Sequence, residues 1–175
     1  MRLFIAIELD QNIKNSLFNI QNHMKKIGVN GNFTPIDNTH ITLAFIGDYP
    51  DPDYVLDVMD NTSFDSFNLS LHGFGNFGNI WWVGLSKSEE LQSYVKQLRQ
   101  CLYEAGIPFD RQKFSPHITL IRKAYYSKGI PRINVPKTKM NVNKISLYRS
   151  DRGKNGMIYT ELGSTPATGL EPVHQ

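Results

Sequence analysis

Two identical tetrapeptides carry the residues best suited to chemistry. The run H-I-T-L at residues 40–43 recurs at residues 117–120. Each copy offers an imidazole that exchanges protons near neutral pH and a hydroxyl that can hold an oxygen atom. Two copies facing each other would supply an acid, a base and two oxygen-binding hydroxyls. That set suits phosphate-ester chemistry without a metal.

Two simpler interpretations of these residues stay open. A single His-x-Thr in a strand is most often just a hydrogen-bonded pair, but the second copy favours a duplicated unit. Two histidines are also zinc ligands, although neither tetrapeptide contains a carboxylate or a cysteine to complete a tetrahedral set. We therefore expect a site without metal or other cofactor, and keep a metal centre as the alternative.

Strand geometry decides which of these side chains work together. Residues i and i+2 point to the same side of a strand, so His40 and Thr42 share one face, as do His117 and Thr119. The alternation of apolar and polar residues predicts seven strands, and capping residues with one-sided apolar spacing predict three helices. We expect α+β with largely antiparallel sheets. The predicted strands cover residues 3–9, 39–46, 67–74, 80–85, 117–121, 142–150 and 156–162, and the helices cover about 10–28, 51–60 and 88–106.

Size and composition set wider limits. The 175 residues, 40% of them hydrophobic, suffice for one domain or two small lobes over residues 1–163, followed by a polar flexible tail over residues 164–175. One cysteine, Cys101, excludes an internal disulfide, and no apolar run approaches the roughly 20 residues of a membrane span. We expect a cytoplasmic protein without a membrane partner. The net charge of +3 permits phosphate binding without requiring it.

Several ordered motifs resemble one known family. They are R-L-F-I-A-I at 2–7, H-I-T-L-A-F-I-G at 40–47, F-S-P-H-I-T-L-I-R at 114–122, and S-L-Y-R-S at 146–150 followed by Gly156 and Tyr159. Over about residues 1–163 the chain resembles the 2H phosphoesterase superfamily, above all its RNA 2′,3′-cyclic phosphodiesterases, historically called 2′-5′ RNA ligases. One departure is Phe33, where the family often has a tryptophan.

The resemblance implies two similar lobes of antiparallel sheet with outer helices, facing across a cleft. It implies hydrolysis of RNA 2′,3′-cyclic phosphate ends to 2′-phosphomonoesters, with 2′-5′ ligation as the formal reverse. In that scheme His40 is the general acid and His117 the base, while Thr42, Thr119 and Arg122 bind phosphoryl oxygens. The expected partners are RNA ends or nucleotides with a cyclic phosphate, and the expected state is a monomer.

Strand geometry makes one demand on this scheme. A residue five positions after His117 points to the opposite face of a regular strand, so Arg122 reaches the phosphate only if the chain bulges or turns after Leu120. A solvent-exposed arginine is the alternative. Trp81 and Trp82 are neighbours in a strand, so one should lie in the core while the other could border the site. Phe4 and Tyr148 are further candidates to line it.

Two other functions stay open. One is hydrolysis of small cyclic nucleotide phosphates or 2′-5′ oligonucleotides. The other is a non-catalytic module that binds RNA ends, although permanent cations would suit phosphate binding better than titratable histidines. The sequence has no G-x-x-x-x-G-K-[ST] loop, so ligation driven by ATP is not expected.

Overall fold

The described part of the chain contains three α-helices and two antiparallel sheets, which confirms the predicted α+β class. The computed structural model describes residues 1–169. Within them the strands form a four-stranded sheet in the order β3-β1-β8-β9 and a five-stranded sheet in the order β2-β6-β5-β4-β7. The elements are β1 (Arg2–Glu8), α1 (Gln11–Lys26), β2 (Asn30–Phe33), the 3-10 turn η1 (Ile36–Asn38), β3 (His40–Asp48), α2 (Pro52–Asp60), β4 (Phe67–Phe77), β5 (Ile80–Leu85), α3 (Glu89–Glu104), β6 (His117–Tyr125), β7 (Lys139–Val142), β8 (Lys144–Gly153) and β9 (Gly156–Pro166).

Each helix begins at a side-chain cap. The oxygens of Asp10, Asp51 and Ser88 accept hydrogen bonds from the first-turn amides of α1, α2 and α3. Each helix then buries one apolar stripe, so the helices must lie on the sheets. The three predicted helices are confirmed.

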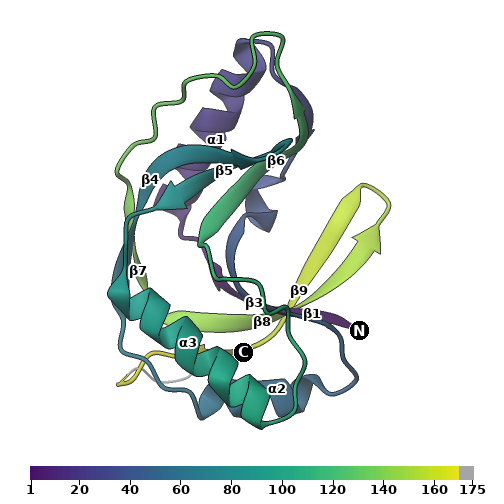
Figure 1. The fold of residues 1–175 in the computed structure, drawn as a ribbon, viewed down its shortest axis with the longest axis vertical. Helices are drawn as coiled ribbons and strands as arrows, with labels where there is room; N and C mark the ends of the chain where they lie inside the picture. Colours follow the sequence, from purple (N-terminus) through teal and green to yellow (C-terminus); the bar gives the residue numbers. More distant parts are fainter. Residues whose placement is uncertain (170–175) are drawn as a thin grey trace.

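The chain passes back and forth between the two sheets. Figure 1 shows α2 and α3 under the four-stranded sheet, while α1 lies with β4, β5 and β6 in the other half of the molecule. Thus α1 follows β1 of the four-stranded sheet but packs against the five-stranded one. In the same way, α3 follows β5 of the five-stranded sheet and packs near β3. Each helix therefore lies behind a strand that is distant from it in sequence.

The sequence does not predict two short strands, β2 and β7. β2 has the sequence N-G-N-F and β7 has the sequence K-M-N-V. β2 is almost wholly exposed, so it lacks the apolar alternation that marks a half-buried strand. Its structure depends on pairing with β6, a tertiary interaction that local sequence does not encode.

The predicted tail begins too early in the chain. β9 continues to Pro166, and Ile145 of β8 pairs with Thr165, whose hydroxyl donates to Asp60 Oδ1 at 2.7 Å. Ala167 is 1% exposed, and the amide of Thr168 donates to a main-chain carbonyl. Residues 164–168 thus belong to the fold through backbone pairing, which a lack of large apolar side chains conceals. The rest of the predicted tail, residues 170–175, lies outside the described residues.

The core forms between the sheets and their helices. Ile41, Leu43, Ile118 and Leu120, the apolar members of both tetrapeptides, are fully buried there. The alternation predicted for these strands is therefore confirmed. Within residues 1–169 no helix combines the length and the apolar character needed to cross a membrane.

Candidate active site

The two tetrapeptides open neighbouring strands from different sheets. β3 begins at His40 and β6 begins at His117, and the two strands lie side by side near the middle of the molecule. Both imidazoles are half-buried, Thr119 is half-buried, and Thr42 is exposed. The fold therefore brings together two units that are far apart in the sequence.

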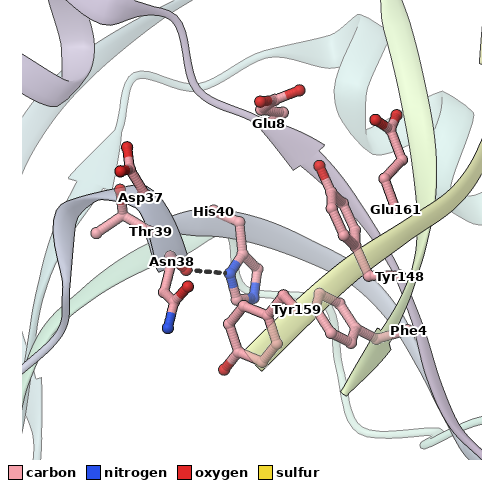
Figure 2. A pocket seen from close by; sticks show the side chains of 9 residues that line it. All are labelled: Phe4, Glu8, Asp37, Asn38, Thr39, His40, Tyr148, Tyr159 and Glu161. Carbon is pink, nitrogen blue, oxygen red and sulfur yellow. Dashed lines mark hydrogen bonds between the residues drawn. The ribbon is translucent and has the colours of Figure 1, made fainter. Parts of the chain in front are cut away.

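Both imidazoles are oriented by the same main-chain device. Nδ1 of His40 lies 2.7 Å from the carbonyl oxygen of Asn38, and Nδ1 of His117 lies 2.7 Å from that of Ser115. Figure 2 shows the first of these bonds. Because a carbonyl only accepts, each Nδ1 carries the hydrogen, and Nε2 is left for proton exchange. Nε2 of His40 lies 2.9 Å from Thr42 Oγ1.

A β-bulge follows the threonine in each unit. Thr119 pairs with Trp82, but the next paired residue of β6 is Ile121, which leaves Leu120 as the extra residue. In β3 the pairing passes from Thr42 to Ala44, so Leu43 is extra in the same way. The expected bulge or turn after Leu120 is thus found one residue earlier, as a bulge at Leu120 itself.

The bulges reverse the alternation of the two strands. Leu120 and Ile121 are both buried in succession, so Arg122 returns to the face that carries the second histidine. In the first unit, Phe45 holds the equivalent fifth position after His40. Within residues 1–169 no carboxylate forms an ion pair with the Arg122 guanidinium. The positive charge of Arg122 is therefore not neutralised by an acidic side chain in this part of the chain.

The environment of His40 disfavours its charged form. Burial lowers the pKa of His40, and the positive charges of Arg122 and His117 lower it further, while the hydrogen bond to Asn38 opposes them. These influences also place Arg122 and His117 within electrostatic reach of His40. Three of the five predicted site residues thus share one electrostatic environment.

This arrangement predicts a measurable titration. We expect the His40 imidazole to lose its proton below pH 6.5, the ordinary value for histidine. Replacing Arg122 by methionine removes a repelling positive charge, so it should raise the pKa of His40. Two-dimensional NMR titration of the histidine ring signals measures both values. An unchanged His40 pKa in R122M would contradict the placement of the guanidinium.

A pocket of about 220 Å³ adjoins His40. Figure 2 shows the rings of Phe4, Tyr148 and Tyr159 along one side of it. The centroid of His40 lies 4.9 Å from that of Phe4 and 5.4 Å from that of Tyr159. Phe4 stacks on Tyr148 at 5.3 Å. Flat aromatic walls of this kind suit a flat ligand group such as a nucleobase.

The far rim of the pocket is acidic. Glu8 and Glu161 line it, and both carboxylates bind the ammonium group of Lys144 at 3.2 Å. Ser146 donates to Glu161 at 2.7 Å. Burial raises the pKa of Tyr148, and the nearby carboxylates raise it further, so its hydroxyl stays neutral. The rim therefore offers fixed acceptors and a neutral phenol.

Aromatic rings also flank His117. The ring of Phe77 lies edge-on at 5.2 Å from the imidazole, and Trp82 lies at 6.0 Å. Trp81 is only 3% exposed in the core. The expected division of the two tryptophans, one in the core and one at the site, is thus confirmed. Phe33, which replaces the family's tryptophan, packs against the core under the ammonium group of Lys25 at 4.9 Å.

Some residues that line the site are not predicted by the sequence. Phe77, Glu8 and Glu161 line the site but belong to no chemical motif, and only the family resemblance points to Tyr159. One signal was available for β9: Tyr159 and Glu161 are two residues apart and so share a face of the strand.

Within residues 1–169 no three His, Cys, Asp or Glu side chains gather as a metal-binding group.

Comparisons with known proteins agree with this geometry. Residues 33–154 match the model of the 2′-5′ RNA ligase superfamily. The chain is 30% identical to the RNA 2′,3′-cyclic phosphodiesterase of Thermotoga maritima, with 93% of each chain covered. It is 26% identical to the enzyme of that name from Methanothermobacter thermautotrophicus, with 93% of this chain and 96% of the relative covered. It superposes on Escherichia coli LigT complexed with 3′-AMP with a TM-score of 0.82, at 26% identity and with 95% and 98% of the two chains covered. The chain therefore belongs to the 2′-5′ RNA ligase superfamily, the group of 2H phosphoesterases.

Proposed function

We propose that this protein hydrolyses RNA 2′,3′-cyclic phosphate ends to 2′-phosphomonoesters. The observation that carries the proposal is the pair of His-x-Thr units on neighbouring strands, with both imidazoles held through Nδ1 and both Nε2 atoms left for proton exchange. The similarity to the RNA 2′,3′-cyclic phosphodiesterases of Thermotoga and Methanothermobacter supports it.

The proposed reaction is a displacement at phosphorus. His117 Nε2 takes a proton from water as the water oxygen bonds to phosphorus. The bond from phosphorus to O3′ breaks, and His40 Nε2 gives its proton to that oxygen, which leaves a 2′-phosphomonoester and a 3′-hydroxyl. The anionic phosphate favours protonation of His40 in the complex, against the lowered pKa of the free site. The same displacement gives 2′-5′ ligation when an RNA 5′-hydroxyl replaces water as the nucleophile, and microscopic reversibility then gives cleavage of a 2′-5′ bond to the cyclic phosphate.

Three polar side chains would stabilise the transition state. In the complex the Thr42 hydroxyl exchanges its bond with His40 Nε2 for one to a non-bridging phosphoryl oxygen, and the Thr119 hydroxyl donates to another. The Arg122 guanidinium neutralises the charge that grows on these oxygens. The bulge at Leu120 supports this role for Arg122, because it returns the side chain to the histidine face. The mechanism uses no metal.

The terminal nucleoside would occupy the pocket beside His40. Its ribose carries O3′, the oxygen that His40 protonates, so its base must lie near this imidazole. The aromatic side formed by Phe4, Tyr148 and Tyr159 offers a stacking surface there. The complex of Escherichia coli LigT with 3′-AMP supports binding of a nucleotide in this fold. A second nucleotide, in ligation or in cleavage of a 2′-5′ bond, would stack on Trp82 and Phe77 beside His117.

One incubation tests the reaction itself. An RNA oligonucleotide ending in a 2′,3′-cyclic phosphate should be converted to a 2′-phosphate end, identified by chromatography against 2′- and 3′-phosphate standards. Turnover should survive excess EDTA, because the acid, the base and the cation are all side chains. Loss of activity that zinc restores would instead establish the metal alternative, and a 3′-phosphate product would reverse the proposed leaving group.

Substrate comparison separates the remaining candidates. Parallel assays with RNA cyclic ends, cyclic mononucleotides and 2′-5′ dinucleotides give kcat/KM for each class. The proposed function predicts the highest value for RNA ends. Tight binding of all three without turnover would point to a non-catalytic module.

A further inference from the structure

A buried glutamine contacts the bulge that turns Arg122 toward the histidines. Gln21 is 3% exposed on the otherwise apolar face of α1. Its Nε2 donates to the carbonyl oxygen of Leu120 at 3.0 Å and to that of Thr34 at 2.8 Å. Both hydrogens of the amide nitrogen are thereby used. The side chain joins the bulge of the second tetrapeptide to the segment that leads into His40.

Arg99 makes the corresponding contacts in the other half of the molecule. Its Nε and Nη2 donate to the carbonyl oxygen of Leu43, the extra residue of the first bulge, at 3.2 and 3.0 Å. Its Nη1 donates at 2.7 Å to the carbonyl oxygen of Gln112, in the segment that leads into His117. Gln21 thus holds the second bulge and the first lead-in segment, whereas Arg99 holds the first bulge and the second lead-in segment.

The two helices place these side chains identically. Gln21 lies ten residues after the first residue of α1, and Arg99 lies ten residues after the first residue of α3 (21 − 11 and 99 − 89), in helices of 16 residues each. The internal repeat therefore includes the supporting helix as well as the tetrapeptide. Because each helix lies behind the strand of the other unit, each support acts across the repeat.

We propose that Gln21 and Arg99 are equivalent positioning residues that fix the two bulges, and that Gln21 acts on catalysis through Arg122. The Leu120 carbonyl also accepts from the amide of Thr34 at 2.9 Å, so the loss of Gln21 removes one of its two donors and the tie to the Thr34 carbonyl. The bulge can then relax toward regular pairing, and a shift of one residue moves Arg122 to the opposite face. Arg99 supports a bulge that ends in Phe45, so its influence does not pass through Arg122. This inference rests on the proposed function for its kinetic readout.

A double-mutant cycle tests the link between Gln21 and Arg122. Q21M keeps the side-chain volume but donates no hydrogen bond, and it should lower kcat/KM for an RNA cyclic end by about tenfold or more, since small misplacements are costly in catalysis. In the R122M background the same change should cost less than about twofold, because the side chain it positions is gone. Equal losses in both backgrounds would overturn the proposal.

Two variants of α3 provide matched controls. Q100M makes the same exchange at an exposed position whose amide donates to Glu104 of the same helix, and it should leave kcat/KM unchanged. R99M should lower activity by a factor that persists in the R122M background. Equal coupling of R99M and Q21M to R122M would overturn the assignment of Gln21 to Arg122.

A second readout does not depend on activity. In NMR titrations Q21M should raise the pKa of His40 as R122M does, and the double variant should raise it no further. This result keeps its meaning if the wild-type protein hydrolyses no cyclic phosphate, in which case only the proposed function fails. Should Q21M not fold, the supporting role shared by the two side chains is tested at Arg99: R99K, which still donates to carbonyls, should retain more activity than R99M. Equal activity of those two variants would contradict the supporting role.

Discussion

His40→Ala and His117→Ala should each lower kcat/KM for an RNA 2′,3′-cyclic phosphate end by roughly 10² to 10⁴-fold, the usual contribution of a positioned acid or base. Both imidazoles stand at the first residue of a strand and bond only to nearby groups: main-chain carbonyls two residues earlier and, for His40, the hydroxyl of Thr42. Their removal therefore deletes a proton-transfer group without opening the core. Chromatographic assays of the product end measure the loss.

The fold and a third histidine serve as controls for this pair. Circular dichroism and thermal melting should show H40A and H117A folded like the wild type. His23 is exposed on α1, so H23A makes the same exchange away from the site and should keep full activity. Turnover at the wild-type rate by either H40A or H117A would sink the two-histidine mechanism.

The sequence alone was sufficient to predict which side chains of the two tetrapeptides share a face. An identical pair of tetrapeptides, read with the two-residue period of a strand, predicts which side chains share a face, and the buried residues Ile41 and Ile118 confirm it. A role for Arg122 at the site even required a bulge or turn near Leu120, and β6 contains a bulge at that residue. These features are local, so the pattern of a few residues contains them.

The features that could not be predicted from the sequence depend on pairing between strands that are far apart in the sequence. β2 is a strand only because β6 lies beside it. Phe77 and Tyr159 reach the histidines through the registers of β4 and β9, which no local pattern determines. The role of Gln21 could not be predicted for another reason. A polar side chain on a helix is usually solvated, and only the fold shows that the carbonyl of Leu120, in the bulge, lies opposite it.

The repeated units have unequal surroundings, and this inequality bears on their roles. His40 has a lowered pKa beside an aromatic pocket with an acidic rim. Arg122 follows the second bulge, where the first unit has Phe45. A lowered pKa makes the protonated imidazole a stronger acid, which favours His40 as the donor to the leaving oxygen. In the proposed reaction the leaving oxygen belongs to the terminal ribose, and the pocket beside His40 would hold that ribose.

A change of leaving group should separate the two roles by a large factor. In a 3′-deoxynucleoside 2′-(4-nitrophenyl) phosphate, nitrophenolate departs from the position of O3′ and needs no proton, so the general acid contributes little. H40A should therefore lose at most about tenfold on this ester, against roughly 10² to 10⁴-fold on the cyclic phosphate. H117A should lose the same factor on both substrates, because water still needs a base. Nitrophenolate absorbance gives the rates.

The comparison holds because each variant is judged against itself. Any weakening of binding by the aryl ester lowers the wild type and both variants alike, and it cancels when the loss on one substrate is divided by the loss on the other. Only the need for a proton at the departing oxygen differs between the substrates. If H117A were rescued and H40A were not, His117 would be the acid, and the terminal nucleoside would have to lie beside Trp82 and Phe77. Equal losses on both substrates for both variants would mean that neither imidazole protonates the leaving group.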